Sequence, residues 1–220
     1  MRIILQQSEN ILSGEQIKQG IRGILPTHIT DMRMQECINS PYVKPKRICY
    51  HENGIKKTWD FIQSLDSVAI ILHRIDIDAL VVVVQFRPPV YVNGQNDGYT
   101  YELCAGLLDK HNKSIKEVAA EEVQEECGYT LSPTQLHSVA EFHTSVGTSG
   151  AKQHIFYASV TQDDKILQGG GVDGEIIQCL LIARADLETF LYNTSYAKTP
   201  GLGFGILWFL QHTTKKGLKQ

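Results

Sequence analysis

The chain has 220 residues, of which 42% are hydrophobic, so it can fill one globular domain, and a second full domain would be crowded. Its 21 basic and 24 acidic residues give a formal net charge of -3, so charge gives no reason to expect binding to nucleic acid or to a membrane. Five cysteines without metal-ligand spacing favour a reducing, cytoplasmic location.

Residues 1–40 show weak periodicity and contain three glycines and Pro26. The chain turns polar at Gln6, too early for the core of an export signal. Its apolar runs are shorter than the ~20 residues that a membrane helix needs. We therefore expect an N-terminal extension without assigned function, in a soluble chain that is not exported.

A β-hairpin is predicted next. Residues 47–51 and 56–61 have the composition of strands, and Asn53-Gly54 between them favours the positive φ angles of a tight turn. This is the clearest hairpin signal in the chain.

The central part of the chain predicts a layered core. Residues 68–72 and 80–84 are continuous apolar runs, which suit strands that are covered on both faces. Pro88-Pro89 ends the second run. Further strands are expected at 99–104, 135–142, 153–160 and 175–182, and further helices at 186–192 and 204–212. This alternation predicts one α/β domain.

One helix is better marked than the rest. Ser114 is placed as its N-cap, Glu117 follows three residues later as in a capping box, and Gly128 comes directly after Cys127 at its end. The last two turns are acidic and contain Glu121, Glu122, Glu125 and Glu126. At ~100° per residue the last three of these share one face of the helix.

These carboxylates are placed unfavourably. Two such charges ~5 Å apart repel by about 3 kcal/mol at an effective dielectric constant of ~20, and the partial negative charge of the helix C-terminus adds to the cost. A bound divalent cation would remove both penalties, and Mg²⁺ prefers carboxylate oxygens and bridges phosphates. A solvated acidic face is the alternative, and charge alone leaves both open.

The segment that begins at Gly106 resembles the Nudix box, whose pattern is GX5EX7REUXEEXGU, where U is a bulky aliphatic residue. Residues 122–128 match EUXEEXG. Glu121 stands where the family has arginine, and the segment is one residue longer, so Asn112 or Lys113 replaces the first glutamate. The family's arginine orients the catalytic helix through ion pairing, so these departures concern local geometry and leave the metal ligands in place.

The resemblance covers most of the chain from residue 42 onward. It is closest to the branch that hydrolyses ADP-ribose and UDP-glucose, and within it to the animal UDP-glucose diphosphatases. Its main motifs are QFRPP at 85–89, ELCAG at 102–106, GGG at 169–171 and FGILWFL at 204–210.

The resemblance implies an α/β fold, a Nudix α/β/α sandwich with an N-terminal β-hairpin region. The expected parts are an extension at 1–40, a dimerising hairpin region at 41–66, the hydrolase domain at 67–214 and a tail at 215–220. It also implies a homodimer in which the N-terminal strands of one subunit help to form the nucleotide pocket of the other.

For the metal centre, the resemblance implies that Glu122 and Glu126 bind Mg²⁺. Glu125 would support them, and the carbonyl of Ala105 would complete the shell.

For the substrate, the resemblance implies that Arg87 holds the diphosphate, because a guanidinium just past a buried strand is well placed to grip phosphate oxygens. Glu102 would contact the substrate or lie near the metal. Trp59 stands where the ADP-sugar members stack the nucleobase; its alternative role is a core residue.

A glycine-rich loop at 168–175 is the last candidate feature. Its alternative is a flexible surface connection, but in the ADP-sugar branch this loop brings acids over the metals, and glycine permits such a motion. Glu175 is the first choice for the general base, Asp173 is the second, and Glu125 follows.

The expected function is Mg²⁺-dependent hydrolysis of nucleoside diphosphate sugars, foremost UDP-glucose to UMP and glucose 1-phosphate. An ADP-ribose diphosphatase, which gives AMP and ribose 5-phosphate, is one alternative. A non-hydrolysing nucleotide-sugar binding module is the other. The expected partners are the nucleoside diphosphate sugar and a second copy of the chain, without nucleic acid or membrane.

Overall fold

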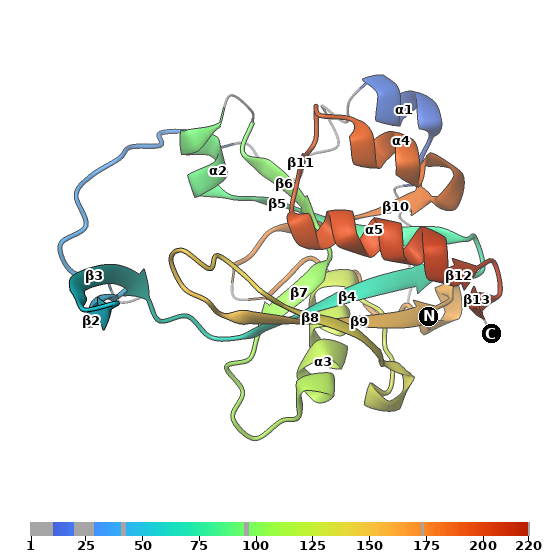
Figure 1. Cartoon of the computed structure of the whole chain (residues 1–220). Coiled ribbons are helices and arrows are strands. Elements are labelled where there is room, and N and C mark those ends of the chain that lie inside the picture. Colours follow the sequence, from blue (N-terminus) through green and yellow to red (C-terminus); the bar gives the residue numbers. More distant parts are fainter. Residues whose placement is uncertain (1–10, 20–28, 41–42, 95–96, 173, 220) are drawn as a thin grey trace.

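The computed structural model describes residues 11–19, 29–40, 43–94, 97–172 and 174–219 (Figure 1). Its helices and strands are, in chain order, β1 (Ile11–Leu12), α1 (Gly14–Gln19), β2 (Pro45–Glu52), β3 (Ile55–Ile62), β4 (Ser67–Arg74), β5 (Ala79–Phe86), α2 (Pro88–Asn93), β6 (Tyr99–Glu102), β7 (Cys104–Leu107), α3 (Ile115–Cys127), β8 (His137–His143), β9 (Lys152–Val160), β10 (Ile177–Ala183), α4 (Leu187–Tyr192), β11 (Ala197–Lys198), α5 (Pro200–His212), β12 (Thr213–Thr214) and β13 (Gly217–Leu218). Within these described ranges, none of the helices is long and apolar enough to cross a membrane.

The centre of the fold is a mixed sheet, which has nine strands among the described residues. Its main order is β1-β10-β5-β4-β9-β8, with β6 beside β5, β7 beside β4 and β11 beside β6. β4 is parallel to β9 and antiparallel to β5 and β7. The two continuous apolar runs therefore form central strands, as their composition predicted.

Helices cover both faces of this sheet (Figure 1). Alternate β4 residues belong to two separate hydrophobic clusters. Ala69 and Ile71 pack in the cluster that includes α1, α4 and α5, whereas Val68 and Ile70 pack in the cluster that includes α3. The α/β/α sandwich expected from the sequence is confirmed.

The described N-terminal residues join this core. β1 pairs in parallel with β10, Leu12 and Ile17 are buried, and α1 contacts α4. Tyr196 donates a hydrogen bond from its hydroxyl to the Ile17 carbonyl at 2.8 Å. This part of the expected extension at 1–40 thus packs into the main domain.

Several elements differ from those predicted. The expected strand at 99–104 is two strands separated by Leu103, because β6 pairs with β5 whereas β7 pairs with β4. Pro88-Pro89 follows the end of β5, as predicted, and begins the unpredicted helix α2, since proline is tolerated in the first turn. α5 begins at Pro200, four residues before the expected start. β10 begins at Ile177, so Glu175 precedes the strand and does not lie at its start.

The predicted hairpin is confirmed as β2–β3, with positive φ at Asn53 and Gly54. Figure 1 shows it standing apart from the central sheet. Ile48 and Trp59 are direct cross-strand partners, so they share one face, and each is about half exposed.

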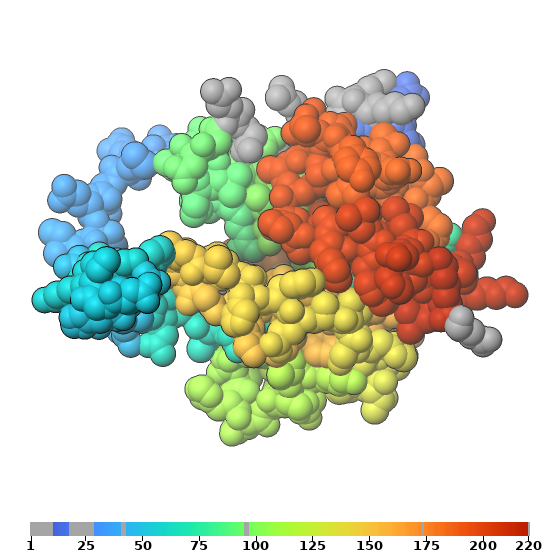
Figure 2. All heavy atoms as spheres, viewed as in Figure 1, coloured from blue at the N-terminus to red at the C-terminus, as the bar shows by residue number. Residues whose placement is uncertain are grey.

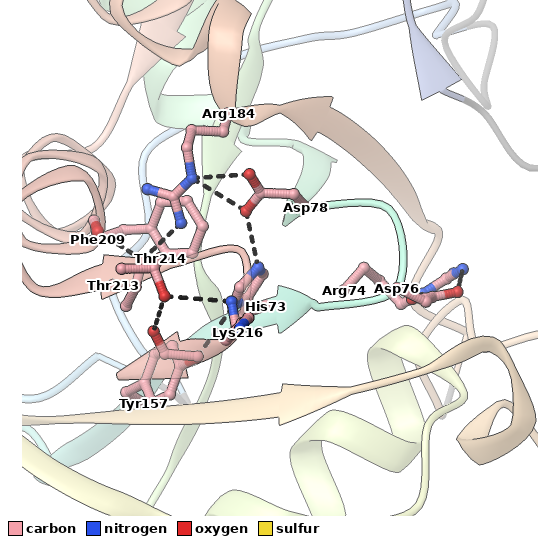
Figure 3. A network of polar contacts seen from close by, with 11 residues as sticks. His73, Arg74, Asp76, Asp78, Tyr157, Arg184, Phe209, Thr213, Thr214 and Lys216 are labelled. Carbon is pink, nitrogen blue, oxygen red and sulfur yellow. Dashed lines mark hydrogen bonds and ion pairs between the residues drawn. The ribbon is translucent and has the colours of Figure 1, made fainter. Parts of the chain in front are cut away.

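A buried polar network ties together the end of the sheet away from β7 (Figure 3). His73 lies 3.0 Å from the Tyr157 hydroxyl and 3.2 Å from Asp78. Arg184 donates to both Asp78 carboxylate oxygens at 2.9 Å and to the Thr213 hydroxyl at 2.7 Å. The network satisfies polar groups from β4, β9, the turn before β5, the residue after β10 and the end of α5, and so fixes the C-terminal helix to the sheet.

Candidate active site

The acidic helix α3 is fixed at both ends. Ser114 accepts from the backbone N–H of Glu117, and the Glu117 carboxylate accepts from the backbone N–H of Ser114 at 2.6 Å. Gly128 ends the helix in the left-handed conformation, with φ 75°. The predicted capping box and glycine stop are confirmed, and they set which residues fall in the last two turns.

Two glutamates of α3 reach the backbone of β7. A Glu126 carboxylate oxygen accepts a hydrogen bond from the Ala105 N–H at 3.0 Å. A Cβ atom at Gly106 would come within 2.0–2.5 Å of the Glu122 carboxyl group. A side chain at position 106 would displace the Glu122 carboxyl group from this place beside β7.

Both of these acids hold their protons unusually tightly. Burial raises the pKa of Glu122 to about 7, and the charges of Glu125 and Glu175 act in the same direction. Burial also raises the pKa of Glu126 to about 8. Buried carboxylates that share a site need a positive partner to ionise, and hard oxygen donors of this kind fit Mg²⁺.

Lysines from the loop before α3 pair with the outer acids. Lys110 Nζ lies 3.1 Å from a Glu121 carboxylate oxygen and 3.4 Å from one of Glu125, and Lys113 also pairs with Glu121. The family's loop glutamate and helix arginine are therefore exchanged for a loop lysine and a helix glutamate. We did not predict this pair, although both departures from the motif are visible in the sequence.

Arg87 and Glu102 lie together beside the pair Glu122 and Glu126. Arg87 donates two hydrogen bonds to the Glu102 carboxylate, at 2.9 and 3.1 Å, and Thr100 donates to it at 2.5 Å. The hydrogen bonds to Glu102 raise the pKa of Arg87, and the charges of Glu126 and Glu175 add to the effect. The Arg87 side chain is about half exposed, with a relative exposure of 46%.

A pocket of about 600 Å³ adjoins Glu102 and Ala105. Figure 2 shows a hollow between the gold surface of the β8–β9 loop and the red surface of α5. Its other lining residues include Phe142, Ser145, Gln153 and Phe204. Apolar walls with a few polar groups are typical of a site for a small organic ligand, and the volume suits one.

The glycine-rich loop is attached to the end of α3. Gly170 donates a backbone hydrogen bond to the Glu126 carbonyl at 2.8 Å, and Gly171 donates to the Glu125 carbonyl at 3.1 Å. A Cβ atom at Gly169 would lie 2.4 Å from the Glu126 carbonyl oxygen. In this structure the glycines allow close contact with the helix end.

The loop also brings Glu175 toward the site. Glu175 is exposed, and its charge contributes to the raised pKa of Glu122, Glu126 and Arg87. Asp173, the other acid expected here, lies outside the described residues.

Trp59 is not part of this group of residues. It lies on β3, its relative exposure is 52%, and its indole N–H donates to the Gly147 carbonyl at 2.9 Å. Trp59 is therefore not a core residue, and within one chain the hairpin stands away from α3 and β7 (Figure 1).

The chain is similar to several proteins of known activity. No family model matches the chain. It is 37% identical over 208 residues to the uridine diphosphate glucose pyrophosphatase NUDT14 of Bos taurus, covering 82% of the chain and 94% of the relative. The Mus musculus protein of the same name is 36% identical over 79% of the chain and 90% of the relative. A GDP-mannose pyrophosphatase of Yersinia enterocolitica is 35% identical over 51% of the chain and 57% of the relative.

Proposed function

The chain belongs to the Nudix hydrolases, and on this premise we propose that it hydrolyses the diphosphate bond of nucleoside diphosphate sugars, foremost UDP-glucose, to UMP and glucose 1-phosphate. The observation that carries this proposal is the pair of half-buried Glu122 and buried Glu126, both packed against β7. A nucleotide-sugar binder without catalysis would gain nothing from two crowded acids of raised pKa.

Enzymes of this family are generally dependent on divalent metals. We propose Mg²⁺, held by Glu122, Glu126 and the carbonyl of Ala105, with Glu125 in support. When bound, Mg²⁺ supplies positive charge to the diphosphate oxygens and lowers the pKa of water. The support for this assignment is the all-oxygen donor set.

Arg87 is proposed to hold the diphosphate. Its guanidinium already makes a two-pronged contact with the Glu102 carboxylate, a geometry that suits phosphate oxygens equally well. Because Arg87 is half exposed, it can exchange Glu102 for the substrate. Glu102 then remains at the pocket wall as a substrate contact.

Glu175 is proposed as the general base, and Asp173 remains the second candidate. The Glu175 carboxylate takes a proton from water, the water oxygen bonds to phosphorus, and the bridging P–O bond breaks to release a sugar phosphate or a nucleotide. The support is its electrostatic influence on both Glu122 and Glu126. The glycines beside it, though attached to α3, permit a closing movement if those hydrogen bonds break.

The hairpin is proposed to form a homodimer. Ile48 and Trp59 form an exposed apolar cross-strand pair in one chain, which suits burial against a second copy. In that dimer Trp59 would stack the nucleobase of the partner's substrate.

The five cysteines are free, which supports the proposal of a reducing, cytoplasmic location.

A turnover screen tests the proposed reaction. Purified protein with Mg²⁺ is offered UDP-glucose, UDP-galactose, ADP-ribose, ADP-glucose and GDP-mannose in water enriched in ¹⁸O. We expect the highest kcat/KM for UDP-glucose, with ¹⁸O in the phosphate of one product. Preference for ADP-ribose would instead identify an ADP-ribose diphosphatase. Tight binding of UDP-glucose without any product would identify a binding module and overturn the proposal.

A further inference from the structure

Three cysteine side chains gather beside Glu126 from three different elements. Cys104 begins β7, Cys127 ends α3, and Cys179 lies in β10. Cys104 and Cys127 are fully buried, and Cys179 is partly buried. The Cys179 thiol donates to the Glu126 backbone carbonyl at 3.3 Å.

Their polar contacts form a continuous chain. Cys127 shares hydrogen bonds with both Cys104 and Cys179, and the Cys104 thiol donates to the Glu126 carboxylate. The ligand atoms of Cys104, Cys127 and Glu126 all lie within 4.8 Å of one another. Two sulfurs bound tetrahedrally at ~2.3 Å from Zn²⁺ are ~3.7 Å apart, so shifts of about 1 Å would bring the set onto one ion.

A plain core cluster does not account for this arrangement. Buried cysteines usually behave as small apolar side chains. Here the sulfurs of Cys104 and Cys127 lie within 4.8 Å of a Glu126 carboxylate oxygen, and a carboxylate is costly to bury among apolar groups. Glu126 keeps 7% of its surface exposed, so the set touches solvent at this residue. The geometry is that of a mixed thiol and carboxylate donor set with an opening at the candidate active site.

We propose that Cys104, Cys127 and Glu126, with Cys179 as the adjacent donor, form an inhibitory site for a thiophilic divalent cation such as Zn²⁺ or Cd²⁺. Sulfur ligands select such cations, whereas Mg²⁺ prefers oxygen, so Mg²⁺ does not compete for the thiols. Binding replaces the thiol hydrogens of Cys104 and Cys127, and both protons pass to solvent.

Inhibition follows because one carboxylate serves two sites. Glu126 turned toward the sulfurs is no longer available to the Mg²⁺ centre at β7. This part of the inference rests on the proposed function, whereas cation binding by the thiols does not.

Cadmium titration of the reduced, Mg²⁺-free protein tests the binding. Cadmium bound to thiolates absorbs in the near ultraviolet, and we expect this absorption to saturate at one equivalent. Cys127→Ser should abolish most of it. Cys37→Ser, which changes an exposed cysteine outside the cluster, should leave it unchanged. Equal absorption in Cys127→Ser and the wild type would overturn the site.

Hydrolysis of UDP-glucose with Mg²⁺ tests the inhibition, each variant being compared with its own rate without Cd²⁺. Loss even of an outer-shell partner costs about 10- to 100-fold in metal affinity, so the half-inhibitory Cd²⁺ concentration should rise at least about tenfold in Cys127→Ser. An unchanged concentration contradicts the proposal. If the wild type hydrolyses no nucleotide sugar, the proposed inhibition is refuted together with the proposed function. The near-ultraviolet absorption still tests whether the thiols bind the cation.

A second variant guards against a folding defect. Should circular dichroism show that Cys127→Ser is unfolded, Cys179→Ala at the partly buried position decides the same question. It should weaken Cd²⁺ binding and inhibition severalfold. No change in either would remove Cys179 from the donor set and overturn the site as proposed.

Discussion

At the scale of single residues, the raised pKa values of Glu122 and Glu126 link protons to stability. Without metal, the folded chain keeps these protons up to about pH 7 and about pH 8, whereas an unfolded glutamate loses its proton near its ordinary pKa of 4.5. Between these limits the folded state binds more protons than the unfolded state, so stability falls as the pH rises. Mg²⁺ competes with the same protons, so its affinity should rise with pH.

The first prediction is therefore a melting profile. In a chelator, the melting temperature should fall between about pH 5 and pH 8 and level off above it. Glu126→Gln should flatten this fall, because one of the two proton sites is removed. Differential scanning fluorimetry measures both. A melting temperature that climbs over this range in the wild type, and equally in the variant, would show that the two acids do not control it.

The second prediction concerns catalysis by the same residue. Glu126→Gln should lower turnover of UDP-glucose at least ~10²-fold, as expected for loss of a positioned catalytic group, and weaken the dependence on Mg²⁺. The control is Glu188→Gln, the same substitution at an exposed glutamate in the first turn of α4. Steady-state rates of both variants at several Mg²⁺ concentrations test this prediction. Full activity of Glu126→Gln would exclude Glu126 as a metal ligand.

The third prediction separates the two loop acids. Glu175→Gln should lower kcat by about 10²–10⁴-fold with little change in KM, because a general base acts in the transition state. Asp173→Asn should have a smaller effect. If their order is reversed, the two roles exchange. If each lowers kcat less than tenfold, the base is elsewhere, and Glu125 and Glu102 become the candidates.

Sequence located the acids of α3 but not their partners. Helical spacing places Glu122, Glu125 and Glu126 on one face, because that relation is local. The contact of Arg87 with Glu102 depends on the pairing of β5 with β6, which no local pattern specifies. The fit of Glu122 against Gly106 likewise depends on how α3 packs on β7.

At the scale of elements, an ion pair between Lys113 of the loop and Glu121 of the helix joins the loop before α3 to α3. Its charges are reversed relative to the family's loop glutamate and helix arginine. Glu121→Arg would place a cation beside Lys110 and Lys113 and should lower both activity and the free energy of unfolding, the latter by about 1 kcal/mol for side chains this exposed. Adding Lys113→Glu restores opposite charges.

Urea unfolding of the two single variants and the double variant tests this fourth prediction as a double-mutant cycle. The double variant should regain at least half of the lost stability and of the lost kcat. Purely additive losses would mean that Lys113 and Glu121 do not orient the helix.

Element boundaries followed the sequence closely where patterns are long and failed where they are short. β4, β5 and α3 were predicted from continuous apolar runs and from capping. β1 and α1 were not predicted, since two and six residues carry no readable period. They are held by β10 and α4, from the other end of the chain.

At the scale of the whole molecule, the hairpin face predicts the oligomeric state. Ile48→Lys should convert the dimer to a monomer, because it removes the exposed isoleucine and places a charge directly opposite Trp59. KM for UDP-glucose should rise as well, since the partner's Trp59 is lost. Thr58→Lys, on the opposite face of the same hairpin, is the matched control. Sedimentation velocity gives the masses, and a monomeric wild type would refute the proposed dimer.

The pairing of β1 with β10 has a consequence for how the chain is made. Synthesis adds about 5–20 residues per second to a chain. Ile11 lies opposite Leu181, so roughly 170 more residues must be added after Ile11 before the partner strand of β1 exists. During that time Leu12 and Ile17 have no core to enter, and β10, once formed, has an open edge until β1 arrives. The pairing of β1 with β10 closes this edge, and because the two strands are far apart in sequence, it should come late in folding. Nascent or refolding chains are therefore most exposed to strand exchange with one another at β10.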